Sequence, residues 1–236
     1  MTATITQKEH KNMNMKRADT IKAVIFDMDG TLFDTEKIST GGWRAAGKAL
    51  GNPMSEALID SFRGNNDEGI TEKMRTHFTT EAEIEKAWEV RNQYAWDQID
   101  RYGVPPKAGL YACLRELKEM NIVICLATGS GRERATRLCH LAGIENDLAY
   151  CLYGDEVEHG KPAPDMYLLS AAKAGFAPAQ CLVVEDSFAG VRSAHAAGCP
   201  VVMIPDLDPP DDEIRSLCDA VLERLDEIPG FIASRK

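Results

Sequence analysis

The chain has 236 residues, of which 44% are hydrophobic and 27% are charged, and its net charge is −10. This length predicts one sizeable hydrophobic core with a smaller second unit, and the negative charge argues against nucleic acid as a partner. No apolar run approaches the roughly 20 residues of a membrane span, so we expect no membrane partner either.

The N-terminal segment, residues 1–18, is polar and lacks the apolar run of a signal peptide, so we interpret it as a flexible leader. The seven cysteines show no Cys-x-x-Cys spacing, which predicts reduced thiols in a cytoplasmic protein. Cys125, Cys151 and Cys181 stand in or beside apolar runs and are expected in the core. We expect a monomer.

The first predicted strand, Ile21–Phe26, is apolar on both faces, as in a buried parallel sheet. It runs directly into Asp27 and Asp29, and Gly30 marks a turn. Ligands of open α/β sheets bind at the carboxyl ends of strands. Two acids this close do not ionise independently without a cation or a proton between them. The pattern favours a metal site or a nucleophile beside an acid/base, and a turn with two solvated acids is the alternative.

Residues 35–103 follow a helical pattern with no convincing strand, and they contain all three tryptophans. We interpret them as a helical bundle inserted into the chain after the first strand. Its predicted helices cover residues 35–50, a short stretch at 57–59, 70–78 and 81–99.

Residues 104–236 alternate between apolar strands and amphipathic helices, which predicts βαβ units and a parallel sheet. Together with residues 19–34 they would form the α/β core. The predicted strands are 122–127, 148–153, 181–184, 201–204 and 220–222, and the predicted helices are 108–120, 130–141, 164–174 and 188–197.

The second predicted strand ends in Thr128-Gly129-Ser130, just before a helix. A hydroxyl and free backbone N–H groups at such a place can bind a phosphate. An ordinary helix N-cap is an equally good interpretation of this segment.

Two further polar segments could complete a site. Lys161 lies in the proline-rich loop 160–165, where a stiff backbone can direct its ammonium group, although a single lysine is usually solvated. Glu185 and Asp186 follow the strand 181–184. Adjacent acids there suit a hard cation such as Mg²⁺, whereas capping of the next helix by Asp186 is the alternative.

Taken together, these four segments, in this order, resemble the motifs of the haloacid dehalogenase-like superfamily of phosphohydrolases: Asp27-Met28-Asp29-Gly30-Thr31, Thr128-Gly129-Ser130, Lys161 and Glu185-Asp186. The inserted helices resemble the cap of the subfamily that includes β-phosphoglucomutase and phosphoglycolate-type phosphatases. The resemblance implies a Rossmann-like core with a mobile helical lid.

The resemblance also implies residue roles. Asp27 would be the nucleophile that forms an aspartyl-phosphate, and Asp29 the general acid and base. Thr128 would bind the phosphoryl group and Lys161 would neutralise it. Further phosphate contacts are expected from three residues of the same motifs: Gly30, Gly129 and Ser130.

By the same resemblance, Mg²⁺ would be held by Asp27, the backbone carbonyl of Asp29, and Asp186, with Glu185 as a further candidate ligand. In the inserted helices, Arg63 could pair with a substrate oxyanion or cap a helix C-terminus, and both interpretations stay open.

The intact motifs predict a phosphatase for a small phosphorylated metabolite, in particular a sugar phosphate, and argue against a dehalogenase or a silent scaffold. The alternative is a β-phosphoglucomutase-like phosphomutase. That family uses a cap histidine and a cap arginine, and by eye these align with Ser39 and near Asp67. Serine cannot be a proton-linked gate near neutral pH, and an aspartate would repel a distal phosphate. The alignment therefore favours the phosphatase.

Overall fold

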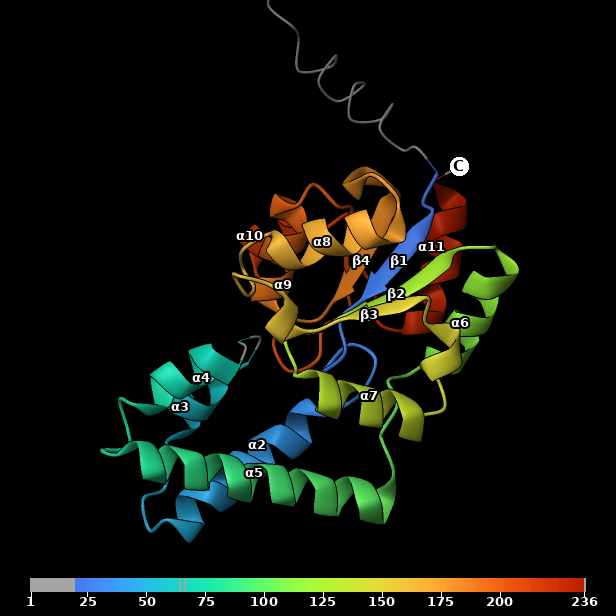
Figure 1. The fold of residues 1–236 in the computed structure, drawn as a ribbon. Helices are drawn as coiled ribbons and strands as arrows, with labels where there is room; N and C mark the ends of the chain where they lie inside the picture. Colours follow the sequence, from blue (N-terminus) through green and yellow to red (C-terminus); the bar gives the residue numbers. More distant parts are fainter. Residues whose placement is uncertain (1–19, 64, 66, 236) are drawn as a thin grey trace, which may run out of the picture.

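The computed structural model describes residues 20–63, 65 and 67–235, so the predicted leader at residues 1–18 lies outside the described residues. Six strands form one sheet in the order β3-β2-β1-β4-β5-β6, and each neighbouring pair is parallel (Figure 1). The predicted α/β fold is therefore confirmed. The strands are β1 (Ala23–Phe26), β2 (Val123–Ala127), β3 (Tyr150–Leu152), β4 (Cys181–Glu185), β5 (Val201–Met203) and β6 (Ala220–Val221).

Strand β1 is central, with β2 on one side and β4 on the other. All four of its residues are fully buried, as expected for an apolar run inside a two-faced sheet. Phe26 lies opposite Leu126 of β2 and Val184 of β4. The three strands therefore end together, and the polar residues that follow each of them meet at one edge.

Helices cover both faces of the sheet (Figure 1). Alternate β1 residues show this, because Phe26 packs in one cluster with α6, α7 and α11 and Ile25 packs in another with α8, α9 and α10. These helices are α6 (Leu110–Glu119), α7 (Arg132–Leu141), α8 (Asp165–Ala174), α9 (Phe188–Ala196), α10 (Asp212–Leu217) and α11 (Ile228–Ser234). Short 3₁₀ turns are η1 (Glu145–Asp147), η2 (Gly154–Glu156), η3 (Pro178–Gln180) and η4 (Leu225–Glu227).

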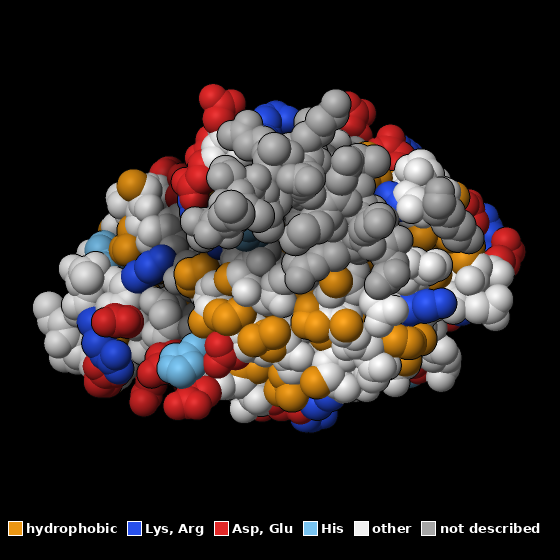
Figure 2. Space-filling model, turned by 90° about the horizontal axis from the view of Figure 1, so that it is seen from above, with side chains coloured by type: hydrophobic (Ala, Val, Ile, Leu, Met, Phe, Trp, Pro, Cys, Tyr) orange, Lys and Arg blue, Asp and Glu red, His pale blue; other side chains and the backbone are white. Residues whose placement is uncertain are grey.

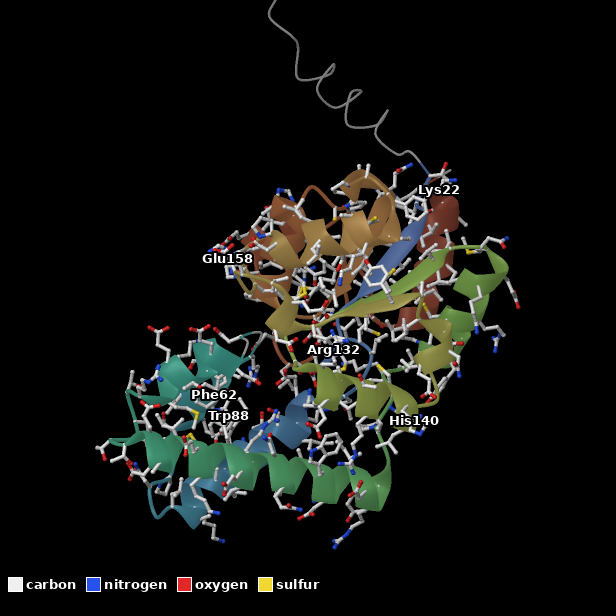
Figure 3. All side chains as sticks on the ribbon, viewed as in Figure 1. Lys22, Phe62, Trp88, Arg132, His140 and Glu158 are labelled. Atoms are coloured by element: carbon white, nitrogen blue, oxygen red, sulfur yellow. The ribbon has the colours of Figure 1, made fainter. Side chains whose placement is uncertain are left out.

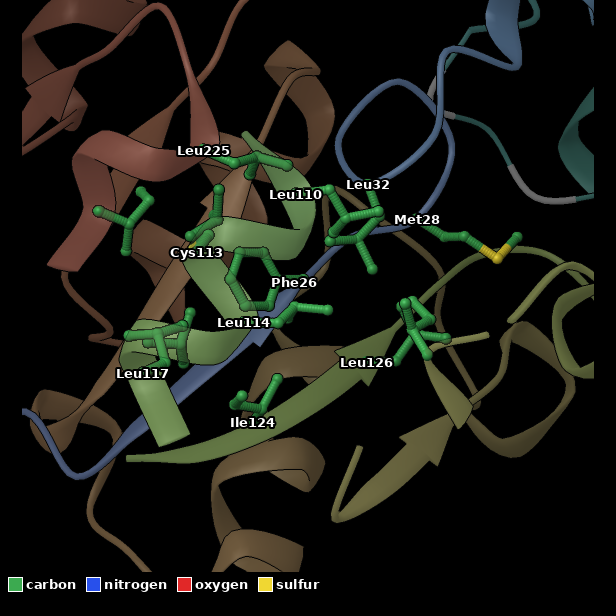
Figure 4. Close-up of a cluster of buried hydrophobic side chains, with 14 of the residues drawn as sticks. Phe26, Met28, Leu32, Leu110, Cys113, Leu114, Leu117, Ile124, Leu126 and Leu225 are labelled. Atoms are coloured by element: carbon green, nitrogen blue, oxygen red, sulfur yellow. The ribbon is translucent and has the colours of Figure 1, made fainter. Parts of the chain in front are cut away.

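The cluster beneath α6 holds the segment after β1 in place. Figure 4 shows Met28 and Leu32 beside Phe26, with Leu110 and Leu114 of α6 above the sheet. All five side chains are at most 1% exposed. The loop that carries the first acids is therefore fixed on its apolar side.

The remaining helices form a helical unit with its own core. They are α2 (Glu36–Ala49), α3 (Glu56–Asp60), α4 (Asp67–Met74) and α5 (Glu81–Tyr102). Trp43 of α2 packs edge-on against Trp88 of α5, with ring centroids 4.7 Å apart. Figure 3 shows Phe62 and Trp88 inside this unit. Trp96 and Ile99 near the end of α5 pack on the sheet cluster instead. The domain boundary at residues 35–103 stays a prediction.

Two connecting segments, one after β1 and one after α5, join the helical unit to the sheet, and they are hydrogen-bonded to each other. The Asp34 amide donates to the Pro105 carbonyl at 2.9 Å, and the Lys107 amide donates to the Leu32 carbonyl at 2.9 Å.

In the described part of the chain, no helix is long and apolar enough to cross a membrane.

Several local predictions need correction. Helix α2 begins at Glu36 rather than at residue 35, and Thr35 at its N-cap makes no capping bond because its hydroxyl donates to Asp29. Helix α7 begins at Arg132 rather than at residue 130. Cys151 is only half-buried, whereas Cys125 and Cys181 are buried. Short helices α10 and α11 were not predicted.

The molecular surface agrees with the acidic composition. On the face shown in Figure 2, acidic side chains border a band of hydrophobic ones. Exposed apolar groups of this kind are normal on a folded protein.

Candidate active site

A cleft of about 750 Å³ lies between the carboxyl edge of the sheet and the helical unit. Asp27, Thr128 and Lys161 line its sheet side, and Trp43 and Arg91 line its helical side. Figure 3 shows Arg132 at the junction of the two. The structure therefore brings the four predicted motifs to one place.

Asp27 is the first residue after β1, and its amide donates to the Val184 carbonyl at 3.0 Å. Its side chain is 10% exposed, and Oδ1 lies 2.5 Å from the Lys161 ammonium nitrogen. Burial raises the pKa of Asp27 to about 8, although Lys161 opposes this shift. A solvated turn is thus the wrong interpretation of the first motif.

Lys161 is 6% exposed, so the solvated-lysine alternative is also wrong. Its ammonium nitrogen lies 2.6 Å from Glu185 Oε1 as well as close to Asp27. Burial would lower the pKa of Lys161, but the carboxylates of Asp27 and Glu185 hold it well above the usual range. The cation is therefore permanent and directed into the site.

Glu185 is fully buried, and both of its oxygens are occupied. Oε1 accepts from Lys161 and, at 2.5 Å, from the Tyr167 hydroxyl. Oε2 accepts from the Asp186 and Ser187 amides at 3.1 and 3.2 Å. A Cβ at Gly190 would come 1.8 Å from Oε1, so only glycine allows α9 to approach this carboxylate.

Asp186 points to the same edge, where Oδ1 accepts from the Thr31 hydroxyl at 2.8 Å. The N-cap of α9 is Ser187, so capping by Asp186 is the wrong interpretation. Burial, together with the charges of Glu185 and Asp27, raises the pKa of Asp186 well above its usual range. Gly30 has φ +87°, and a Cβ there would come 2.2 Å from Asp186 Oδ2.

The three acids at this edge form a candidate cation site. One oxygen from each of Asp27, Glu185 and Asp186 lies within 4.8 Å of the others. Clustered carboxylate oxygens fit Mg²⁺. Burial raises the pKa values of Asp27 and Asp186, and the neighbouring Glu185 charge, which a cation would offset, adds to the rise. The hydrogen bonds of Glu185 leave Asp27 and Asp186 as the better placed ligands.

Asp29 faces a different set of partners. Arg134 of α7 binds it with both terminal nitrogens, at 2.6 and 2.7 Å. The hydroxyls of Ser130 and Thr35 also donate to it, at 2.8 and 2.5 Å. Burial would raise the pKa of Asp29, but Arg134 outweighs burial and holds it well below the usual range. Asp29 is therefore ionised in this arrangement.

Thr128 is 1% exposed at the end of β2 and accepts from the Ser130 amide at 3.1 Å. The N-cap of α7 is Gly131, so Thr128 is not a helix cap. A Cβ at Gly154 would come 2.3 Å from the Gly129 carbonyl oxygen, so the backbones of these two loops are in close contact. The Ser130 hydroxyl is directed to Asp29, and its predicted phosphate contact stays a prediction.

Arg63 lines the cleft, but its charge is already neutralised. One terminal nitrogen pairs with Asp60 on the same helical unit, and the other lies 2.8 Å from Asp208 Oδ2 on the sheet side. Its side-chain bonds go to these carboxylates rather than to carbonyls at a helix C-terminus, and its pairing with a substrate oxyanion stays a prediction. Arg63 thereby connects the helical unit to the loop after β5.

Three functional contacts were missed by sequence analysis. Arg134 could have been suspected from its short separation, because it lies four residues after Ser130 and donates to the Ser130 hydroxyl at 2.7 Å, although Ser130 precedes α7. The contacts of Tyr167 and Thr31 join segments far apart in the chain, and no local pattern indicates them.

Carboxylates and a buried lysine meet at the carboxyl edge of a parallel sheet, with a helical unit across the cleft, and these side chains could hold a hard cation and an anion. Residues 21–198 match the model of the haloacid dehalogenase-like hydrolase family. The chain belongs to this family, as the motifs predicted.

Similar proteins agree with this assignment. The chain is 33% identical to a Drosophila melanogaster protein named "Probable pseudouridine-5'-phosphatase", over 77% of this chain and 80% of the relative. It is 28% identical to the beta-phosphoglucomutase of Bacillus subtilis, over 88% and 95%. The crystal structure of a mutant of CbbY from Rhodobacter sphaeroides, in complex with xylulose-(1,5)bisphosphate, has the same fold, with a TM-score of 0.77, 22% identity, and coverage of 88% of this chain and 96% of that one.

Proposed function

We propose that this protein is a Mg²⁺-dependent phosphatase that hydrolyses a small phosphorylated metabolite, in particular a sugar phosphate, through an aspartyl-phosphate on Asp27. The observation that carries the proposal is the position of the Lys161 ammonium group. It lies 2.5 Å from Asp27 and 2.6 Å from Glu185, inside the cleft and beside a third acid. Relatives named as phosphatases support the same reaction class.

The residues fit a bound Mg²⁺. Asp27, Asp186 and the Asp29 backbone carbonyl would hold it, with Glu185 as a further candidate, and the bound ion would supply charge neutralisation for the phosphate dianion. Lys161 supplies the chain's own positive charge at the same place. Without such charges, an aspartate and a phosphate would repel each other.

In the first step, an Asp27 carboxylate oxygen attacks phosphorus and the bond from phosphorus to the leaving oxygen breaks. Asp29 gives its proton to that oxygen. In the second step, water attacks the aspartyl-phosphate, Asp29 takes the proton, and the bond between phosphorus and Asp27 breaks. Free phosphate leaves, and Asp27 is again a carboxylate.

The ion pair between Arg134 and Asp29 adds a condition to this two-step reaction. With both nitrogens of Arg134 on its oxygens, Asp29 is ionised, which suits its role as the base of the second step. Before it can act as the acid of the first step, Asp29 must separate from Arg134 and take a proton.

The phosphomutase remains the second candidate because one relative is named a beta-phosphoglucomutase. Ser39, which aligns by eye with the mutase histidine, accepts a hydrogen bond from Arg91 at 2.8 Å. A serine with an arginine partner has no ionisation near neutral pH that could gate water. This contact favours the phosphatase.

The reaction is tested with p-nitrophenyl phosphate, Mg²⁺ and the Asp27→Asn variant. We expect hydrolysis that stops with a chelator and falls by at least about 10³-fold in Asp27→Asn, because the amide is nearly isosteric but is no nucleophile. Asp97→Asn, at an exposed position of α5, is the matched control. Full turnover by folded Asp27→Asn would rule out this mechanism.

The choice between phosphatase and mutase is tested with β-glucose 1-phosphate and catalytic glucose 1,6-bisphosphate. Free phosphate and glucose 6-phosphate are followed together. Glucose 6-phosphate formed much faster than free phosphate would establish the mutase instead.

A further inference from the structure

Ser193, on α9, is a fully buried polar residue that the proposed reaction does not use. Its hydroxyl donates to the Ala163 carbonyl at 2.6 Å, so it joins α9 to the loop at residues 160–164. Lys161 belongs to this loop and lies two residues before the bonded carbonyl. Ser193 is therefore connected to the buried cation of the site through three residues of backbone.

This hydrogen bond leaves the helix to which Ser193 belongs. A serine inside a helix can donate to a carbonyl of its own helix, about four residues earlier. Ser193 donates instead to a segment 30 positions away in the sequence. Among the residues that the structure describes, no other side chain donates to a backbone carbonyl of residues 160–164, since the Gly160 and Pro164 carbonyls accept only from nearby amides of the same segment.

Helix α9 also holds the carboxylate that pairs with Lys161. The Ser187 hydroxyl donates to Glu185 Oε2 at 3.1 Å, and Gly190 lets the helix backbone approach the same carboxylate. Ser187, Gly190 and Ser193 are spaced by three residues, which places them along one side of a helix. One helix therefore fixes both Glu185 and the loop of Lys161, whose ammonium nitrogen lies 2.6 Å from Glu185 Oε1.

The charges of the site alone do not fix the ammonium group. Lys161 lies between the carboxylates of Asp27 and Glu185, but its charge is carried on a flexible four-carbon side chain. Coulomb attraction changes only gradually with distance, so it draws the cation in without setting one position. A misplacement of about 1 Å can lower a rate by about 10²-fold, so the position of the loop backbone matters.

From these contacts we infer that Ser193 is a positioning residue, whose hydrogen bond to Ala163 fixes the loop so that the Lys161 ammonium group stays on Asp27. The effect on rate rests on the proposed function, whereas the position of Lys161 can be measured without turnover. In this scheme Ser193 does not contact the substrate, and it acts only through the backbone of residues 161–163.

The position of Lys161 is measured by its rate of acetylation with acetic anhydride, followed by peptide mass spectrometry of the full chain without substrate. In wild type we expect slow acetylation, because Lys161 is 6% exposed and paired with two carboxylates. In Ser193→Ala we expect acetylation of Lys161 about threefold faster or more, because a loop that has lost a hydrogen bond opens more often. Lys107 is the internal reference, since it is 14% exposed and also paired with a buried carboxylate.

The matched control is Ser170→Ala. Ser170 is also fully buried, but its hydroxyl has no hydrogen-bond partner among the described residues. This variant should leave the acetylation rate of Lys161 unchanged. Equal acetylation of Lys161 in wild type and in Ser193→Ala would overturn the inference. A parallel rise at Lys107 and Lys161 would also overturn it, because it would show that Ser193 only supports overall stability.

Kinetics with p-nitrophenyl phosphate then test whether this position matters for the reaction. We expect kcat of Ser193→Ala to be about tenfold lower than wild type, and a smaller fall in Ser193→Cys, because a thiol is a weaker donor. In the Lys161→Met background, Ser193→Ala should lower kcat no further, since two residues that act through one group are not additive. A further fall of the same size would overturn the inference. Absence of any hydrolysis would contradict only the proposed function, because the acetylation rates do not depend on it.

Discussion

The two sides of the cleft contain buried cations in opposite situations. On the sheet side, Lys161 lies between the carboxylates of Asp27 and Glu185. On the helical side, the Arg91 guanidinium carbon lies 5.6 and 5.8 Å from the ring centroids of Trp43 and Trp88, and its hydrogen bonds go to the neutral side chains of Ser39 and Asn92. The three acids of the sheet side outnumber the single Lys161 cation, and a bound cation would offset the excess, whereas Arg91 on the helical side hydrogen-bonds neutral groups.

This difference separates the proposed reaction centre from the helical side of the cleft. The groups proposed to perform the reaction follow adjacent strands of one sheet, whose register fixes them relative to each other. The helical side belongs to helices joined to that sheet by two connectors. We therefore expect a substitution on the helical side to leave the position of Asp27 unchanged.

The largest expected difference between the two sides of the cleft is in the effect of removing each cation. Lys161→Met leaves two buried carboxylates without a counter-charge, which we expect to cost about 3–5 kcal/mol of unfolding free energy. We also expect kcat to fall about 10²- to 10³-fold. Arg91→Met should leave the unfolding free energy equal or higher. Urea titrations and steady-state kinetics of both variants measure this.

Equal changes in unfolding free energy in Lys161→Met and Arg91→Met would contradict this difference between the two sides. A fall in kcat of less than about tenfold in Lys161→Met, with unchanged Mg²⁺ affinity, would also remove Lys161 from the reaction centre.

The pH dependence of Mg²⁺ binding tests the sheet side alone. Burial raises the pKa of Asp27 to about 8 and also raises that of Asp186, so below pH 8 the metal-free cluster retains protons. Those protons must leave before the carboxylates bind a cation. We expect Mg²⁺ affinity to rise about tenfold per pH unit between pH 6 and 8 for one displaced proton. Calorimetry in two buffers of different ionisation enthalpy counts the protons, and a pH-independent affinity would contradict this.

Tyr167→Phe is a milder change to the same cluster. It removes the hydroxyl that donates to Glu185 but retains the ring, whose centroid lies 5.3 Å from the Lys161 nitrogen. A hydrogen bond to a charged group contributes about 1.5–3 kcal/mol to stability. Because Tyr167 acts on the reaction only through Glu185, we expect part of this contribution to appear in kcat, as a fall of about tenfold or less. Tyr111→Phe, at an exposed position, is the control. A fall in kcat as large as that of Lys161→Met would contradict this, because it would show that Glu185 depends on Tyr167 as much as on Lys161.

The smallest expected effect is on overall shape. If the connectors let the helical unit close on the sheet, beryllofluoride with Mg²⁺ should reduce the radius of gyration in solution scattering. Unchanged scattering profiles would count against closure.

The sheet and its motifs could be predicted because their signals are local. Ala23–Phe26 is an apolar run that ends in acids, and the same pattern recurs at 181–186. By contrast, α10 and α11 have six and seven residues, too few for a helical period to show.

The partners of the site residues could not be predicted in the same way. Arg91 bonds Ser39 across 52 positions and Tyr167 bonds Glu185 across 18, and only tertiary packing brings them together. Sequence analysis left two roles of Arg63 open. The structure adds an ion pair with Asp208, which no local pattern could predict because Asp208 lies 145 positions away.

The central position of β1 has a consequence for how the protein is made. Its partner β4 ends at Glu185, about 160 residues after Phe26. At 5–20 residues per second, the ribosome needs roughly 8 to 32 s to synthesise that length. During this time β1 lacks both neighbours until β2 ends at Ala127, and afterwards its β4 side stays unpaired, whereas α2–α5 are complete once Tyr102 has been added. We therefore expect the helical unit to fold before the sheet, and nascent β1 to be a binding site for chaperones.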